Sequence, residues 1–169
     1  MSKITETSFR PVAKKDAQAV MDIYNREVLG SRVTLDLVPR TLPQQLVWID
    51  EHQGAYPAIV ATVGEQVVGF ASVSSYRIRH GYSTTVEDSV YVHPEYRGRG
   101  IGKQLLERIV ERATVHGFHA CMARIVEGHH ASLALHASLG FFVVGTEREV
   151  GRKFGQWISV VLLERMLNT

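Results

Sequence analysis

Apolar residues recur along the chain with two different spacings. In some segments they recur every three or four residues, which places them on one face of a helix. In others, β-branched and apolar residues form short runs bounded by glycine, proline or polar residues, which is typical of strands. The first pattern predicts helices over residues 14–29, 41–52 (with Thr41 as N-cap), 101–117 and 131–139. The second predicts strands over residues 7–12, 56–63, 66–75, 84–93, 120–126, 141–149 and 157–165.

The order of these segments predicts an α/β fold with a mixed sheet. Gly64 and Glu65 separate two strand-like runs, which is typical of an antiparallel hairpin. Later strands alternate with helices, as in parallel crossovers. A mixed sheet flanked by helices is therefore favoured over a purely parallel one. No repeat or linker interrupts the 169 residues, so we expect residues 1–169 to form a single domain.

Composition and charge exclude several classes of protein. The 19 basic and 17 acidic residues nearly balance, whereas a nucleic-acid-binding protein should be dominated by a basic face. Cys121 is the only cysteine, so neither an intrachain disulfide nor a zinc cluster is expected, and we predict that it lies in the core. The N-terminal MSKITETSFRP lacks the apolar core of a signal peptide, and no run approaches the ~20 apolar residues of a membrane span. A soluble cytoplasmic protein without a membrane partner is the expectation.

A glycine-rich turn follows the strand at 84–93, where the chain reads HPEYRGRGIGK. Three glycines stand at every second position: Gly98, Gly100 and Gly102. Glycine lets the backbone approach a ligand and adopt positive φ, and the free N–H groups at a helix start attract an anion. Three cationic residues surround the same point: Arg97, Arg99 and Lys103. The turn therefore predicts a site for a phosphate-bearing ligand.

Two familiar phosphate-binding motifs do not fit this turn. A P-loop needs four residues between its glycines and a Ser or Thr after the lysine, whereas three separate Gly98 from Gly102 and Gln104 follows Lys103. The dinucleotide motif also fails, because Gly100-Ile101-Gly102 is followed by Lys-Gln-Leu. The remaining alternative is a flexible turn whose basic residues are solvated.

Two segments together resemble a known family. Arg97-x-x-Gly100-x-Gly102, preceded by SVYVHPEY, is similar to the acetyl-CoA site of the GCN5-related N-acetyltransferase (GNAT) family, and ALHASLGF at 134–141 resembles its second signature. The resemblance implies a mostly antiparallel central sheet flanked by helices, acetyl-CoA as co-substrate and no metal. In that family the backbone of the strand before the turn pairs with the pantetheine arm, and the amides of the turn hold the pyrophosphate. The implied cofactor residues here are Val90, Tyr91, Val92, Arg97, Gly98, Arg99, Gly100, Ile101, Gly102, Lys103 and Ser132.

A narrower resemblance concerns the substrate. TVEDSVYV (85–92), HASLALHASLGF (130–141) and VGRKFGQW (150–157) look like the phosphinothricin and methionine sulfoximine N-acetyltransferase branch. Enzymes of this branch acetylate the α-amino group of small acidic amino-acid analogues and are homodimers, so the resemblance implies a small amine substrate and a homodimer here. In the branch, basic residues and a tyrosine in the corresponding loop face the substrate. The resemblance therefore implies three substrate-binding residues here: Arg77, Arg79 and Tyr82. The branch usually carries an aromatic residue within the segment 31–36, where this chain has only Leu35 as a large apolar side chain next to the predicted pocket.

Acetyl transfer to an amine requires a base, because an α-amino group is protonated near neutral pH. Glu87 is the candidate, since burial on its strand would raise its pKa and the resemblance implies this role for the glutamate of the T-V-E motif. His136 stands where many members of the family have a tyrosine, and it could protonate the leaving thiolate or hydrogen-bond the base. The alternatives are a solvated glutamate and a packed histidine. A metal site at His129, His130 and His136 is weakly supported, because no carboxylate or thiolate completes the ligand set.

Three functions remain open at this level. The first is acetyl-CoA-dependent N-acetylation of a small amino-acid-like amine. The second is acetylation of a peptide or protein N-terminus, which the two loop arginines disfavour. The third is a CoA-binding module without turnover, which should have lost the base, whereas Glu87 and His136 are both present here.

Overall fold

The computed structural model describes residues 6–167. Its strands form one seven-stranded sheet with the order β1-β2-β3-β4-β5-β7-β6. All neighbours are antiparallel except β4 and β5, which are parallel, so the predicted mixed and mostly antiparallel sheet is confirmed. The strands are β1 (Thr7–Pro11), β2 (Ala58–Val63), β3 (Gln66–Ser75), β4 (Thr85–Val92), β5 (Ala120–Val126), β6 (Phe142–Lys153) and β7 (Gln156–Met166).

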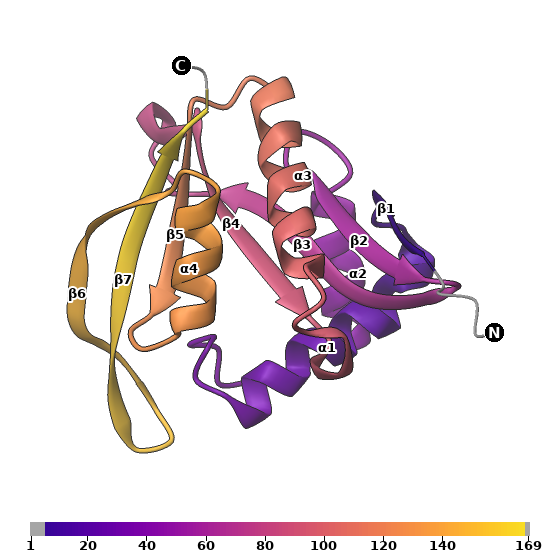
Figure 1. Cartoon of the computed structure of the whole chain (residues 1–169), viewed down its shortest axis with the longest axis horizontal. Coiled ribbons are helices and arrows are strands. Elements are labelled where there is room, and N and C mark those ends of the chain that lie inside the picture. Colours follow the sequence, from indigo (N-terminus) through magenta and orange to yellow (C-terminus); the bar gives the residue numbers. More distant parts are fainter. Residues whose placement is uncertain (1–5, 168–169) are drawn as a thin grey trace.

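Helices cover both faces of the sheet, and Figure 1 shows α3 and α4 over β3, β4 and β5 in this view. The α-helices are α1 (Ala17–Gly30), α2 (Leu42–Glu51), α3 (Ile101–Val115) and α4 (His130–Ser138). Short 3-10 helices are η1 (Lys14–Asp16), η2 (His80–Tyr82) and η3 (Pro94–Tyr96). Within the described residues, no helix is long and apolar enough to cross a membrane. The first five residues, part of the N-terminal segment considered above, lie outside the described range.

The core is divided in two by the sheet. Ile59 and Ala61 of β2 pack in the cluster built on α3, whereas Ala58 and Val60 pack in the cluster with α1 and α2. This alternation follows from the strand period of two, which sends successive side chains to opposite faces. Cys121 is fully buried in the α3 cluster, as predicted.

The last two strands are longer than the sequence pattern predicts. The strand expected at 141–149 extends to Lys153, and the next begins at Gln156, so the two form one long hairpin. Its turn is made by Phe154 and Gly155, which adopt φ of 51° and 74°. The polar and glycine-rich sequence of this hairpin hides the strand pattern, because much of it is exposed and carries no apolar alternation.

The parallel pair β4 and β5 positions the functional site. Their described pairing covers three positions and ends where Glu87 meets Met122. Beyond that point β4 continues to pair with β3 as far as Val92, and β5 continues to pair with β7 as far as Val126. The two strands therefore diverge, as Figure 1 shows, and the sheet opens between their carboxyl ends.

Candidate active site

A cleft of about 770 Å³ lies at this opening. Its walls come from β4, the glycine-rich turn, the first turn of α3, β5 and the first two turns of α4. The loop after α1 closes one side through Val33, Thr34 and Leu35. The carboxyl ends of two parallel strands and the N-termini of two helices thus meet around one cavity, which is the usual place for a ligand in such sheets.

The glycine-rich turn forms an anion cradle made mainly of backbone. Gly98 and Gly100 adopt φ of 73° and 76°, the left-handed region that glycine enters without strain. Gly100 is the N-cap of α3, so the next three N–H groups have no partner within the helix. These N–H groups belong to Ile101, Gly102 and Lys103, which all line the cleft. Their orientation at the positive end of the helix dipole suits a phosphate.

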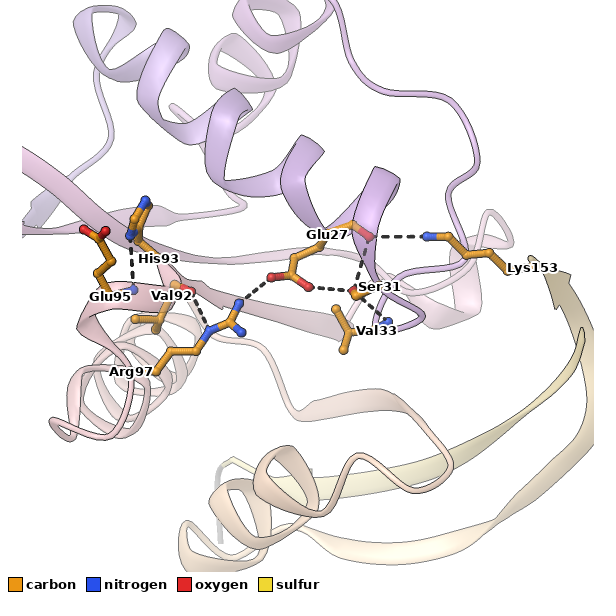
Figure 2. A network of polar contacts seen from close by, with 8 residues as sticks. All are labelled: Glu27, Ser31, Val33, Val92, His93, Glu95, Arg97 and Lys153. Carbon is orange, nitrogen blue, oxygen red and sulfur yellow. Dashed lines mark hydrogen bonds and ion pairs between the residues drawn. The ribbon is translucent and has the colours of Figure 1, made fainter.

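Arg97 and Arg99 do not act as free charges in this cradle. The Arg97 guanidinium forms an ion pair with Glu27 of α1, and its Nε donates to the Val92 carbonyl at 3.0 Å (Figure 2). Arg99 lies outside the residues that line the cleft in the described chain, and it donates to the Glu95 carbonyl at 3.0 Å. The sequence places both arginines beside the glycines, but their side chains are engaged in holding the turn.

The Glu27 network continues from the turn to the β6–β7 hairpin, as Figure 2 shows. Ser31 Oγ donates to the second Glu27 carboxylate oxygen at 2.6 Å. Lys153, which is only 3% exposed, donates from Nζ to the carbonyls of Glu27 at 3.4 Å and Thr34 at 2.8 Å. Burial lowers the pKa of Lys153, although Asp36 and Glu27 oppose this. The network therefore fixes the end of α1 and the loop that forms the cleft wall.

Glu87 lies in the cleft at the last rung of the β4–β5 pairing. It is half-buried, and burial raises the pKa of its carboxyl. The charge of Arg124 opposes this rise, whereas the carboxylates of Asp88 and Glu147 add to it. A carboxyl with a raised pKa inside a cleft suits general-base chemistry near neutral pH.

His136 lines the cleft and forms a buried pair with Asp88. Its Nε2 lies 2.9 Å from Asp88 Oδ2, with side-chain exposures of 5% and 2%, and its Nδ1 lies 2.8 Å from the Ser132 carbonyl. Both ring nitrogens face acceptors, an arrangement that favours the doubly protonated, cationic imidazole. Burial alone would lower the pKa of His136, but the hydrogen bond and charge of Asp88 outweigh it and the pKa is raised.

The structure thus joins His136 to Asp88 on the α3 side of the sheet, not to Glu87 on the opposite face. Sequence reasoning did not identify Asp88. A signal was present, because strand alternation places Asp88 on the same face as Val86 and Val90, and a carboxylate on an apolar face needs a partner.

Other predicted cofactor residues also meet in the cleft. Val90 and Val92 line it from β4, and Ser132 lines it from α4. Tyr91 lines it as well, with its ring stacked on Phe70 at 5.3 Å. Of the predicted cofactor residues, only Arg99 is outside the lining formed by residues 6–167.

Comparison with known protein families shows which family has this sequence pattern. The model of the acetyltransferase (GNAT) family matches residues 18–141, which include the turn, Glu87 and His136. The chain belongs to the GNAT family.

Three similar proteins have related names. A phosphinothricin N-acetyltransferase from Streptomyces coelicolor is 38% identical, over 99% of this GNAT chain and 100% of that protein. An L-methionine sulfoximine/L-methionine sulfone acetyltransferase from Pseudomonas paraeruginosa is 36% identical, over 95% of each chain. The solved GNAT superfamily phosphinothricin acetyltransferase from Sinorhizobium meliloti, in complex with acetyl-CoA, matches with a TM-score of 0.91 and 35% identity, over 95% of this chain and 88% of that one.

The predicted substrate residues of this GNAT chain are not among the described residues that line the cleft, and their role stays a prediction. Arg77, Arg79 and Tyr82 are exposed, and none belongs to the lining formed by the described residues. The Arg77 guanidinium lies 5.5 Å from the Tyr82 ring centroid. Instead, Arg124 of β5 reaches the cleft. Its signal in the sequence was an arginine inside the apolar strand ACMARIV, a position that needs a polar surface on one side of the sheet.

Proposed function

We propose that the chain transfers an acetyl group from acetyl-CoA to the amino group of a small amino-acid-like substrate of the phosphinothricin or methionine sulfoximine/sulfone type. The observation that carries this proposal is the cleft itself, which has a backbone anion cradle on one side and the half-buried Glu87 beside it. The names of the relatives support the substrate class. We further propose that residues 1–169 act as one catalytic domain.

The residues present fit acetyl-CoA. The cradle offers three helix-start N–H groups and Lys103 to a pyrophosphate. Beyond Glu87, the β4 edge towards β5 has no described strand partner, so its backbone can pair with an extended, amide-containing arm beside Val90 and Val92. Ser132 and His129 lie at the start of α4 on the other side. When bound, acetyl-CoA supplies an activated acetyl thioester.

Glu87 is the proposed base. It accepts a proton from the substrate ammonium, directly or through one water, and so leaves a neutral amine that is nucleophilic. Burial raises the pKa of its carboxyl, which makes it a stronger base than an exposed glutamate. His136 is the second proposed catalytic residue. When protonated, its ring can donate a proton to the leaving thiolate. The hydrogen bond and charge of Asp88 favour the protonated ring, and delivery of its proton requires one of the two hydrogen bonds of the ring to exchange.

Release of the CoA thiol with an amine panel tests this function. The protein should release the CoA thiol from acetyl-CoA when methionine sulfone, methionine sulfoximine or phosphinothricin is the amine. It should not do so when the amine is a peptide. Glu87→Gln should lower kcat/KM by about 100-fold or more, the usual contribution of a general base. Glu107→Gln, on the exposed side of α3, is the matched control. Turnover with peptides alone would favour N-terminal acetylation, and binding of acetyl-CoA without turnover of any amine would favour a non-catalytic module.

A homodimer is also proposed, in a cytoplasmic location. The sheet ends at β6, and large apolar side chains of the β6–β7 hairpin are exposed, including Phe142, Val143, Phe154 and Trp157. An exposed apolar edge strand is a typical interaction surface. Light scattering after size-exclusion chromatography should give twice the 18.9 kDa chain mass, and a monomer across micromolar concentrations would contradict this proposal.

The proposed cytoplasmic location is compatible with the single buried thiol of Cys121, since a reducing compartment keeps thiols free.

A further inference from the structure

Arg124 is a cleft residue to which neither the family motifs nor the mechanism above gives a role. It lies on β5 and lines the cavity. Its Nη2 donates to Glu147 Oε2 of β6 at 2.6 Å, and the two side chains are 35% and 31% exposed. A guanidinium has five N–H donors, and Glu147 accepts one hydrogen bond from it here. Among residues 6–167 no other hydrogen-bond partner of this guanidinium is found, so the rest of the fork is available to a ligand.

The sheet register places Arg124 on the same face as Glu87. Glu87 pairs with Met122 in the parallel ladder, so these two side chains share a face. Arg124 follows Met122 by two positions and therefore lies on that face too, at the point where the strands diverge. Cys121, Ala123 and Ile125 face the α3 cluster on the other side.

The remaining cations of the described cleft are not beside the proposed base. Arg97 is paired with Glu27, and Lys103 belongs to the anion cradle on α3. His136 is bound to Asp88 on the opposite face of the sheet. Arg124 is therefore the cation placed to meet a group attached to the same carbon as the amine that Glu87 deprotonates.

We propose that Arg124 binds the α-carboxylate of the amino-acid substrate and that Glu147 holds its guanidinium in place, an inference that rests on the proposed function. A carboxylate matches the planar fork of arginine in a bidentate pair. Binding has a second effect, because the Arg124 charge opposes the rise in the pKa of Glu87. A bound carboxylate neutralises that charge and makes the base stronger. Amines without a carboxylate lack both the ion pair with Arg124 and the increase in the basicity of Glu87.

The test compares methionine sulfone with its carboxamide, which has the same side chain and no carboxylate. The wild-type kcat/KM should favour the acid by about 10- to 100-fold, as expected for charged hydrogen bonds. Arg124→Gln should reduce this ratio to near one, mainly through a higher KM for the acid. Arg148→Gln, an exposed arginine next to Glu147 on β6, is the matched control and should keep the ratio.

A charge swap separates recognition from a purely structural pair. Arg124→Glu combined with Glu147→Arg preserves an ion pair between β5 and β6 and should fold like the wild type. The proposal expects the swapped protein to discriminate against the acid. Recovery of the wild-type ratio by the swap, or equal loss of both substrates in Arg124→Gln, would overturn it.

Failure of the proposed function gives a different result. In that case the wild type acetylates neither compound although it folds and binds acetyl-CoA. Calorimetric titration with methionine sulfone then still tests Arg124. Binding that is at least 10-fold weaker in Arg124→Gln than in the wild type supports the carboxylate site, and equal or absent binding in both proteins rejects it.

Discussion

Asp88→Asn removes the charge from a pair whose two side chains are only 2% and 5% exposed. The His136 imidazolium then has no counter-ion in a buried position, and its Nε2 keeps at most a neutral partner. Breaking one side of a buried pair typically costs about 3–5 kcal/mol. For a chain of this length each kcal/mol shifts Tm by about 2–4 °C, so the midpoint should fall by roughly 6–20 °C.

The pH dependence of this loss identifies its cause. The pKa of His136 is raised above its ordinary value of 6.5 in the folded protein, because Asp88 outweighs the effect of burial. The folded state therefore holds this proton more tightly than the unfolded state. The resulting stabilisation is fully present below the unfolded pKa and is lost as the pH rises through the raised folded value. The gap between wild type and Asp88→Asn should be widest in mild acid and narrow towards alkaline pH.

Urea unfolding over a pH series measures this gap. His136→Gln and the double variant complete a thermodynamic cycle, which isolates the coupling between the two side chains. Asp22→Asn, an exposed aspartate on α1, is the control and should change stability by less than about 0.5 kcal/mol. The reasoning is refuted if Asp88→Asn stays within about 1 kcal/mol of the wild type, or if the gap widens as the pH rises.

Further predictions concern the base, the cradle and the cleft wall. Since burial raises the pKa of Glu87, kcat/KM should fall as the pH drops through a value above that of an ordinary glutamate, and Glu87→Gln should lack this limb in a pH–rate series. Gly100→Ala should cost about 1–2 kcal/mol in urea unfolding because φ is 76°, whereas Gly102→Ala should keep stability and weaken CoA binding measured by calorimetry. A Cβ on Gly151 would lie 2.7 Å from Leu35 Cδ1. Gly151→Ala should therefore displace Leu35 in the cleft wall and raise KM for the amine substrate. Adding Leu35→Ala to this variant should restore the KM.

Local patterns predicted the parts of the site that depend on few neighbours. The spacing of Gly98 and Gly100 predicted a close backbone approach, and both adopt positive φ. Strand alternation placed Glu87 and Asp88 on opposite faces, as in the structure. Periodicity also predicted the helices to within a few residues of their ends. The helix predicted from residue 14 begins as η1 and continues as α1. These features follow from propensity and period, which a linear sequence contains.

Pairs that are distant in the sequence were not predictable in this way. Glu27 and Arg97 are 70 residues apart, and Asp88 and His136 are 48 apart. Arg97 and Lys103 look alike in the sequence as cations beside glycines, but α1 supplies a carboxylate to only one of them in the described structure. Which cation stays free depends on how α1 packs against the sheet, and that is set by tertiary contacts.

The same long-range pairs explain how the sheet stays together where it opens. Between β4 and β5 the described backbone ladder ends at Glu87 and Met122, so the cleft exists at the expense of strand pairing. Side-chain links bridge the gap instead. The Asp88–His136 pair joins β4 to α4 on one face, and the network of Glu27 with Arg97 and Lys153 joins the turn, α1 and the β6–β7 hairpin on the other (Figure 2). Because buried polar groups are costly when unpaired, these links hold the walls in one arrangement while the strand edges remain available to a ligand.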